Sequence, residues 1–137
     1  QDDYAKMCYD KVKALNLEDF FEFHPATPEI VKIYQNCDIF CLPSLFEGYP
    51  NVLCEAMSCG KPVICGRVCD NERIVEERKN GILFDPTNVV EIVDTLQEII
   101  SLSNEQRQQW GCMSRTISEE KFSMNAFVEK YIQLVER

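Results

Sequence analysis

The chain has 137 residues, and 45% of them are apolar, which is enough for one domain with a buried core. Its 14 basic and 23 acidic residues give a net charge of −9, so it lacks the basic surface that nucleic acids require and is disfavoured as an anchor on anionic membranes. No apolar run approaches the roughly 20 residues of a membrane-spanning helix, and the acidic start does not resemble a signal peptide.

Apolar periodicity and turn residues predict helices and strands that alternate along the chain. In chain order we expect a helix over residues 2–15, a strand over 20–24, a helix over 28–36, a strand over 39–42, a helix over 50–59, a strand over 63–66, a helix over 71–79, a strand over 82–84, and helices over 88–102, after 103 and after 123. Strands that alternate with helices are typical of a parallel sheet covered on both faces. The sequence therefore predicts an α/β, Rossmann-like fold with about four strands, in a single domain over residues 1–137.

Residues with side-chain acceptors mark the starts of several helices. The expected N-caps are Thr27, Asp70, Ser103 and Ser123. Gln106 follows Ser103 by three residues, which predicts a capping box.

The helix over 88–102 and the final helix each carry an apolar stripe. The first stripe consists of Val89, Val90, Val93, Leu96 and Ile100. The second consists of Met124, Phe127, Val128, Tyr131, Leu134 and Val135. We expect both stripes to belong to the core rather than to a partner surface.

The most informative segment runs from residue 44 to residue 64 and holds two glutamates separated by seven residues. Glu47 lies in a Gly/Pro turn after the strand over 39–42, and Glu55 lies in the helix that this turn opens. The strand over 63–66 follows, so the segment is a βαβ unit. Ligands of open α/β sheets bind at the carboxyl ends of the strands. Both acids are therefore expected near a binding site.

The residues around this helix start suit a phosphorylated ligand that carries hydroxyls. Pro50 fits the first helical position, and the N–H groups of Asn51 and Val52 then point out of a helix end that attracts anions. Gly48 lets the backbone approach a ligand closely. The two glutamates can accept hydrogen bonds from a ribose diol and from a second sugar. A nucleotide-sugar site is one interpretation, and an ordinary turn beside a solvated helix residue is the other.

The segment resembles the signature of group 1 glycosyltransferases, the retaining enzymes of the GT-B fold. The matching residues are Pro43-Ser44, Glu47-Gly48, Pro50-Asn51-Val52-Leu53, Glu55-Ala56-Met57, Gly60 and Pro62-Val63-Ile64. The similarity continues into residues 80–86 and back into residues 33–38. It covers nearly the whole chain, which resembles the C-terminal, nucleotide-sugar-binding half of a family 4-type enzyme.

The resemblance implies that Glu55 binds the nucleotide ribose and that Glu47 contacts the donor sugar in the catalytic site. The substrate-binding residues that it implies are Glu47, Gly48, Tyr49, Pro50, Asn51, Val52 and Glu55. The implied reaction transfers a sugar from a nucleotide diphosphate donor to an acceptor hydroxyl with retention of configuration. It implies no cofactor and no metal ion.

Some positions depart from the family pattern. Cys69-Asp70 and Glu72-Arg73 stand where many members have Gly-Gly and Pro-Glu, so we assign no ligand role to Glu72. His24 stands where a strand usually ends in glycine, and we expect its role to be structural. The acidic face formed by Glu72, Glu76 and Glu77 is expected to be solvated.

The family's acceptor domain, its Arg/Lys loop and two strands of its C-terminal domain have no counterpart in these 137 residues. We therefore expect a fragment that is inactive alone, with the acceptor glycan, lipid or small molecule bound by the missing half. The strand order implied by the resemblance leaves a gap between the strands over 20–24 and 39–42. These strands either pair directly in a four-stranded sheet, which we favour, or leave an edge at which two chains pair as a homodimer.

Eight cysteines are scattered along the chain without a Cys-x-x-Cys motif, and there is one histidine. This spacing does not predict a zinc site, and most of the cysteines suit small hydrophobic positions. Reduced thiols are the rule in cytosolic proteins. We expect a cytoplasmic location, with any peripheral membrane contact made through the missing half.

Two other functions stay open. One is a nucleotide-sugar epimerase of the same fold, although its loop differs from the Glu-Gly-x-Pro-Asn form found here. The other is a non-catalytic module for nucleotide-sugar binding or interaction, which is how an isolated half-enzyme would behave.

Overall fold

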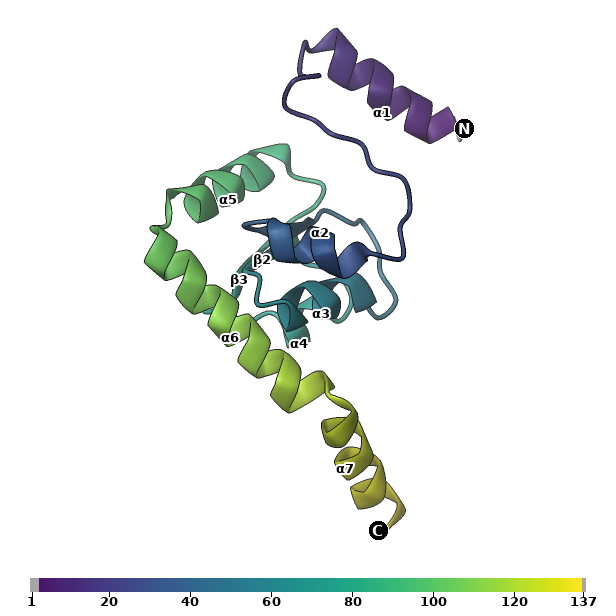
Figure 1. Ribbon diagram of the computed structural model, residues 1–137, viewed down its shortest axis with the longest axis vertical. Coiled ribbons are helices and arrows are strands. Elements are labelled where there is room, and N and C mark those ends of the chain that lie inside the picture. Colours follow the sequence, from purple (N-terminus) through teal and green to yellow (C-terminus); the bar gives the residue numbers. More distant parts are fainter. Residues whose placement is uncertain (1–2, 137) are drawn as a thin grey trace.

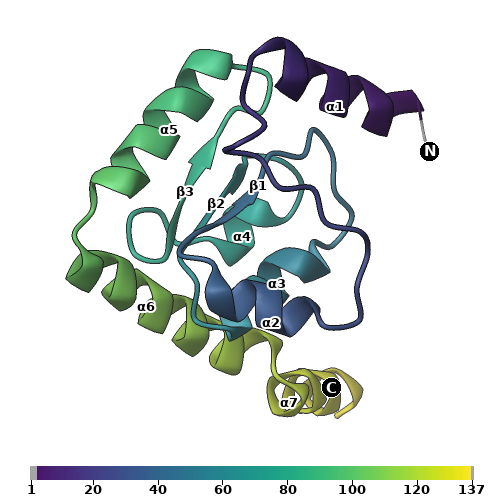
Figure 2. The same cartoon turned by 45° about the horizontal axis from the view of Figure 1, so that its top comes forward.

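The computed structural model describes residues 3–136 and places three parallel strands at the centre of the molecule. The strands are β1 (Phe40–Leu42), β2 (Val63–Gly66) and β3 (Gly81–Phe84), in the spatial order β1-β2-β3 (Figure 2). Phe40 pairs with Val63, and Val63 pairs with Gly81. The α/β class is confirmed, with three strands among the described residues in place of about four.

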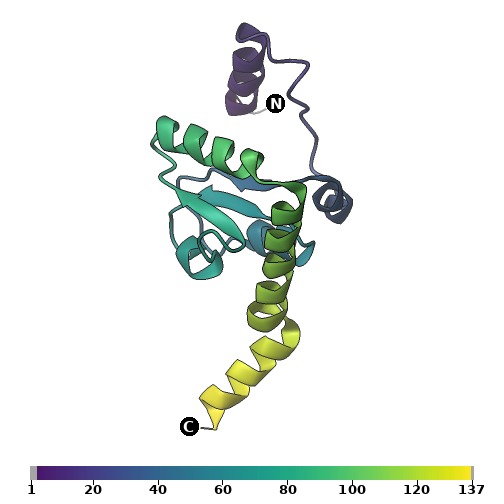
Figure 3. The ribbon, with the colours of Figure 1, turned by 90° about the vertical axis from the view of Figure 1, so that its left-hand side faces the viewer.

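Helices lie around this sheet, and the first and last helices of the chain extend away from it (Figure 1). They are α1 (Asp3–Ala14), α2 (Ile30–Asn36), α3 (Asn51–Ser58), α4 (Asn71–Ile74), α5 (Val89–Ser101), α6 (Asn104–Phe122) and α7 (Met124–Val135). In the side view of Figure 3, α5 covers one face of the sheet and α3 covers the other. Most bounds match those predicted from the sequence within two residues.

Alternate residues of the strands point into two separate apolar clusters, as the pleat of a strand requires. The cluster on the α3 side includes Val63, Cys65, Leu83, Leu53, Ala56 and Met57. The cluster on the α5 side consists of Ile64, Ile82, Phe84 and Ile99, with partly buried residues around them. Both faces of β2 and β3 are therefore buried, which is typical of a parallel sheet.

Helix α6 crosses the end of α3 at a pair of glycines. Gly60 follows α3 with a φ of +72°, and Gly111 lies in the middle of α6. A Cβ atom on Gly111 would lie 2.2 Å from the carbonyl oxygen of Gly60, so the two backbones meet where no side chain fits. On either side of this crossing, Trp110 packs against the α5-side cluster and Ile117 belongs to the α3-side cluster.

Two of the four predicted N-caps, Ser103 and Ser123, make their capping hydrogen bonds. Ser103 Oγ accepts the backbone N–H of Gln106 at 3.2 Å, and Gln106 Oε1 accepts that of Ser103 at 2.9 Å, so the capping box is confirmed. Ser123 Oγ accepts a backbone N–H at 3.2 Å at the start of α7. The predicted Thr27 cap is wrong, because α2 begins at Ile30 with Glu29 as its N-cap, and Thr27 accepts the backbone N–H of Glu29 at 3.1 Å in the turn before the helix.

The predicted strand over residues 20–24 is wrong. The backbone N–H groups of Phe20 and Phe21 both donate to the carbonyl oxygen of Leu17, so the segment begins as a turn that continues α1. Phe23 then packs on Tyr9 of α1, with ring centroids 4.1 Å apart. These local contacts hold the aromatic residues away from the sheet, and Phe20 is 81% exposed. The four-stranded closed sheet that we favoured is therefore also wrong, and β1 is an edge strand.

The predicted helix over 71–79 is shorter than expected, since α4 ends at Ile74. Ile74 and Val75 are both buried, and Val75 has already turned to an extended conformation. Asn80 then stabilises the loop that follows, because its Oδ1 accepts the backbone N–H of Glu76 at 2.7 Å. Tertiary burial of two β-branched residues overrides the helical pattern here.

The outer edge of β3 is closed by side chains from this loop and from the loop that follows β2. Glu77 Oε2 accepts the backbone N–H of Leu83 at 3.2 Å, and Arg67 donates to the Leu83 carbonyl oxygen at 3.3 Å. Glu76 pairs with Lys121 of α6 at 3.0 Å. The prediction that the acids after Asp70 are simply solvated is therefore wrong for Glu76 and Glu77.

The prediction that both apolar stripes belong to the core is wrong for all of these residues except Leu96, which packs against the α5-side cluster. In α5, Val89, Val90, Val93 and Ile100 are exposed, while Thr95 and Ile99 are the buried residues. In α7, all six stripe residues are exposed. The periodicity identified amphipathic helices correctly, but it did not predict which face is buried.

Candidate functional site

The loops that follow β1, β2 and β3 meet at the carboxyl end of the sheet, as the sequence predicts for a binding site. Two of these loops contact the backbone at Gly66, the last residue of β2. A Cβ atom there would lie 2.7 Å from the carbonyl oxygen of Ser44 and 3.2 Å from Pro86. The β1–α3 loop is therefore seated on the end of β2.

This loop carries Glu47 and Gly48. The Glu47 side chain is half-buried, and within residues 3–136 its carboxylate has no hydrogen bond or ion pair. A Cβ atom on Gly48 would meet nothing within 4 Å, and its φ lies outside the left-handed region. Neither packing nor backbone conformation in the described chain requires glycine at position 48. That a ligand approaches the backbone closely at this position stays a prediction.

The start of α3 differs in one respect from the sequence-based expectation. Pro50 is the N-cap residue rather than the first helical residue, and α3 begins at Asn51. The Asn51 N–H donates to the carbonyl oxygen of Tyr49 at 2.9 Å, so it is not free for a ligand. Within the described chain, the N–H of Val52 has no acceptor. Of the two donors predicted for an anion, only Val52 keeps that capacity.

Glu55 lies in the second turn of α3 with its side chain exposed. Its Oε2 accepts a hydrogen bond from the hydroxyl of Tyr34 on α2 at 3.1 Å. Tyr34 is 4% exposed, and burial followed by the bond to Glu55 raises the pKa of Tyr34 to about 12. The hydroxyl therefore stays protonated at neutral pH and acts as the donor.

Tyr49 lies between Glu47 and Glu55 in sequence, and its ring contacts another part of the chain. Its centroid is 6.4 Å from that of Phe122 at the end of α6, in an edge-to-face arrangement. Its hydroxyl oxygen also lies 3.9 Å from the thiol of Cys54. Sequence reasoning missed Tyr34 and Phe122, because both contacts join residues that are far apart in the chain.

The loop after β2 contributes charged groups to the same end of the sheet. Arg67 pairs with Glu72 at 3.5 Å, and Asp70 pairs with Arg73 at 3.0 Å. Asp70 occupies the N-cap position of α4 as predicted, but its side chain makes no capping hydrogen bond.

His24, which we expected to be structural, is an exposed residue 3.5 Å from Glu22. It lies on the connection to α2, outside the loops that meet at Gly66. No group of three or more histidine, cysteine or acidic side chains within residues 3–136 is arranged to hold a metal ion. All eight cysteines are free thiols.

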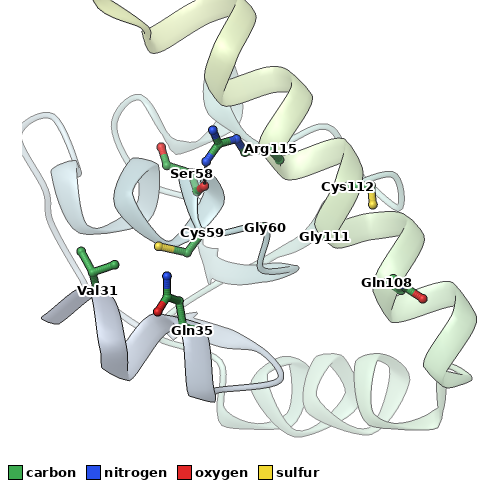
Figure 4. Close-up of a pocket in the computed structure, with 9 residues that line it drawn as sticks. All are labelled: Val31, Gln35, Ser58, Cys59, Gly60, Gln108, Gly111, Cys112 and Arg115. Atoms are coloured by element: carbon green, nitrogen blue, oxygen red, sulfur yellow. Dashed lines mark hydrogen bonds between the residues drawn. The ribbon is translucent and has the colours of Figure 1, made fainter.

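A hollow in the described part of the molecule lies at the opposite end of α3. This cavity of about 610 Å³ is bounded by α2, the Ser58–Gly60 turn and α6 (Figure 4). Arg115 reaches across from α6 to the carbonyl oxygen of Ser58 and also pairs with Glu119 at 2.6 Å. None of the seven predicted site residues lines this cavity, and it lies away from the carboxyl ends of the strands.

The described residues contain no helix that is both long and apolar enough to cross a bilayer.

The family model described as "Glycosyl transferases group 1" matches residues 1–116. An uncharacterized glycosyltransferase of Haemophilus influenzae is 33% identical over 120 residues, which cover 87% of this chain and 33% of that protein. The N,N'-diacetylbacillosaminyl-diphospho-undecaprenol alpha-1,3-N-acetylgalactosaminyltransferase of Campylobacter jejuni is 32% identical over 117 residues, which cover 82% of this chain and 29% of that protein. The chain thus spans about a third of the length of these relatives.

Solved structures show the same architecture. Anabaena HepE in complex with UDP superposes with a TM-score of 0.89 at 23% identity, over 98% of this chain and 37% of that one. The C-terminal domain of the group 1 glycosyl transferase LpcC from Francisella tularensis superposes with a TM-score of 0.76 at 26% identity, over 90% of this chain and 64% of that one. LpcC is described as a group 1 family glycosyl transferase, and both structures share the fold of this chain, so the predicted fold class is confirmed.

Proposed function

Because the chain belongs to the group 1 glycosyltransferases, we propose that it is the C-terminal, donor-binding part of a longer, retaining transferase of the family 4 type. One observation carries the proposal. Glu47 and Glu55 flank the start of α3 at the carboxyl end of the sheet, and Glu47 has no partner among the described residues. The two acids are available to accept hydrogen bonds from two sugars.

The proposed donor is a nucleotide diphosphate sugar. Glu55 accepts hydrogen bonds from the ribose, and Glu47 contacts the transferred sugar. The free N–H of Val52 and the dipole of α3 favour the negative charge on the diphosphate. In the reaction, the acceptor oxygen replaces the diphosphate on the anomeric carbon with retention of configuration. Stabilisation of the departing diphosphate is the main catalytic contribution that we propose, and it requires no metal ion.

The structures of HepE with UDP and with UDP-glucose support a nucleotide-sugar donor for this chain. The acceptor is proposed to bind to a part of the protein outside these residues. We also propose a cytoplasmic location, in agreement with the free thiols.

We propose that the 137-residue chain has no transferase activity alone, because both substrates must be held in near-attack geometry. Formation of glycoside from UDP-glucose, GDP-mannose or ADP-glucose by the purified chain, above the rate in buffer, would contradict this proposal.

A test of the two glutamates uses calorimetry on the protein expressed from its complete coding sequence. Glu55→Ala is expected to weaken binding of the free nucleoside diphosphate by about 1.5–3 kcal/mol, the range for hydrogen bonds to a charged group. Glu47→Ala should leave that affinity nearly unchanged and lower turnover. Equal losses of nucleotide affinity in the two variants would show that the roles are wrongly assigned.

Two further variants serve as controls. Glu55→Gln keeps an acceptor for the buried Tyr34 hydroxyl and removes the charge, so it separates ligand binding from folding. Glu120→Ala removes an exposed acid from α6 and should change neither affinity nor turnover. An epimerised nucleotide sugar as the product, in place of a glycoside, would favour the epimerase. Nucleotide binding without any turnover would favour the non-catalytic module.

Two alternatives were predicted for the open edge of the sheet, a closed four-stranded sheet or pairing of two chains. Since the closed sheet is wrong, the edge at β1 offers a place for a second copy of the chain. We propose that the isolated chain pairs through this edge as a homodimer. Light scattering should give the mass of two chains, and a monomer at all concentrations would contradict the proposal.

A further inference from the structure

Tyr34 joins helix α2 to the proposed ribose-binding residue. Its ring is buried and packs edge-to-face on Phe40 of β1, with centroids 5.6 Å apart and planes at 79°. Its hydroxyl donates to Glu55 Oε2 at 3.1 Å. Because the ring is held by the core, the position of the hydroxyl is set by the fold rather than by the ligand.

The two partners differ in their freedom to move. Glu55 is exposed and has three side-chain torsions, so its carboxylate would sample many positions if nothing held it. Within residues 3–136, the bond from Tyr34 is the one hydrogen bond to this carboxylate. It occupies Oε2 and leaves Oε1 to accept a bond from outside.

We infer that Tyr34 is a positioning residue, whose hydroxyl holds the Glu55 carboxylate in place for the ribose diol. This inference rests on the proposed function, because it assigns the second oxygen of Glu55 to the nucleotide. Ordering a side chain before the ligand arrives removes part of the entropy cost of binding. The anchor comes from a helix and a strand, which fix geometry better than a loop does.

Helix α2 is itself attached to the rest of the domain, so Tyr34 is a firm support. Lys61, which follows α3, donates to the carbonyl oxygen of Gln35 at 2.9 Å. Tyr34 also belongs to the same apolar cluster as Leu53, Ala56 and Met57 of α3. Helix α2, which carries Tyr34, and helix α3, which carries Glu55, are therefore connected at two points.

The test measures nucleotide affinity in the Tyr34→Phe variant of the protein expressed from its complete coding sequence. UDP, GDP and ADP are titrated first, and the tightest of the three is then compared with its 2′-deoxy form. Tyr34→Phe keeps the ring and removes only the hydroxyl, so we expect an affinity loss of about 3–10-fold for the ribonucleotide. We expect a loss of less than about twofold for the 2′-deoxy form, since the diol that Glu55 recognises is then incomplete. In a Glu55→Ala background, Tyr34→Phe should cause no further loss.

A purely structural hydroxyl would give a different pattern. Ile99→Val is the matched control, because it weakens the core on the opposite face of the sheet and leaves Tyr34 and its hydroxyl bond untouched. It should lower the midpoint of urea unfolding without changing the ratio between ribonucleotide and 2′-deoxy affinities. Wild-type affinity in Tyr34→Phe, or an equal loss for both nucleotides, would overturn the positioning role and leave the proposed function intact. Failure of the wild-type protein to bind any of the three nucleotides would overturn the proposed function and the positioning role together.

Discussion

Replacing Gly48 with alanine separates what the ligand requires from what the fold requires. A Cβ atom at this position would meet nothing within 4 Å, and the backbone φ is one that alanine adopts without strain. Alanine restricts the unfolded chain more than glycine does, so Gly48→Ala should raise the free energy of unfolding by about 0.4–1 kcal/mol. If the nucleotide sugar lies against the backbone at Gly48, the methyl group that this substitution adds would occupy space that the ligand needs. Affinity for the nucleotide sugar should then fall at least about tenfold, or about 1.4 kcal/mol.

Urea unfolding and calorimetry on the same preparation measure the two effects. Gly111→Ala is the matched control, because its Cβ would lie 2.2 Å from the Gly60 carbonyl oxygen, far from the proposed site. Overpacking there costs about 1–3 kcal/mol and outweighs the roughly 1 kcal/mol gained in helix propensity. Gly111→Ala should therefore lower stability by up to about 2 kcal/mol. A Gly48→Ala variant that is less stable than wild type, or that binds the nucleotide sugar with unchanged affinity, would refute a close approach of the ligand at Gly48.

Three other measurements follow from the structure. Hydrogen bonds from Lys121 and then Lys79 hold the pKa of Glu76 below its usual value of 4.5, so its contribution is present above that pH and is lost as the pH falls through the lowered value. The Glu76→Gln variant should therefore lose less unfolding free energy than wild type between about pH 5 and pH 3. An equal loss in the two proteins over this range would contradict the pairing. Burial raises the pKa of the Cys65 thiol to about 12, so iodoacetamide at neutral pH should modify the exposed Cys112 and Cys69 long before Cys65, as read by mass spectrometry. Ser103→Ala removes half of the capping box of α6 and should cost about 1 kcal/mol in urea unfolding, whereas an unchanged midpoint would show that the cap is not needed.

Elements whose signals are local were predicted well from the sequence. The strand over 63–66 has the bounds of β2, and the capping box at Ser103 forms as expected. Both depend on residues within a few positions of one another, and the buried strands are continuous apolar runs. The candidate binding segment can be proposed from the sequence for the same reason, since the β1–α3 loop with Glu47, Gly48 and the helix start is one stretch of chain.

The features that were not predicted from the sequence depend on contacts between residues that are far apart in the chain. Tyr34 and Glu55 are 21 residues apart, and Asn80 meets Ser114 of α6 across 34 residues. Nothing in the spacing of a single sequence marks such pairs. The turn at Leu17 and the burial of Val75 likewise override patterns that favour a strand and a longer helix. Local pattern reasoning predicts the part of a site that is contiguous, and packing supplies the residues that hold it.

The two edges of the sheet differ in a way that only the structure reveals. On β3, Glu77 and Arg67 occupy the outward backbone groups of Leu83, so this edge offers little to another strand. On β1, Cys41 stands between the two residues that bond to β2, and its side chain is exposed. Native proteins usually block an exposed sheet edge with charged side chains or cover it. The side chains on β3 therefore leave β1, which precedes the loop that carries Glu47, as the edge at which a further strand can pair.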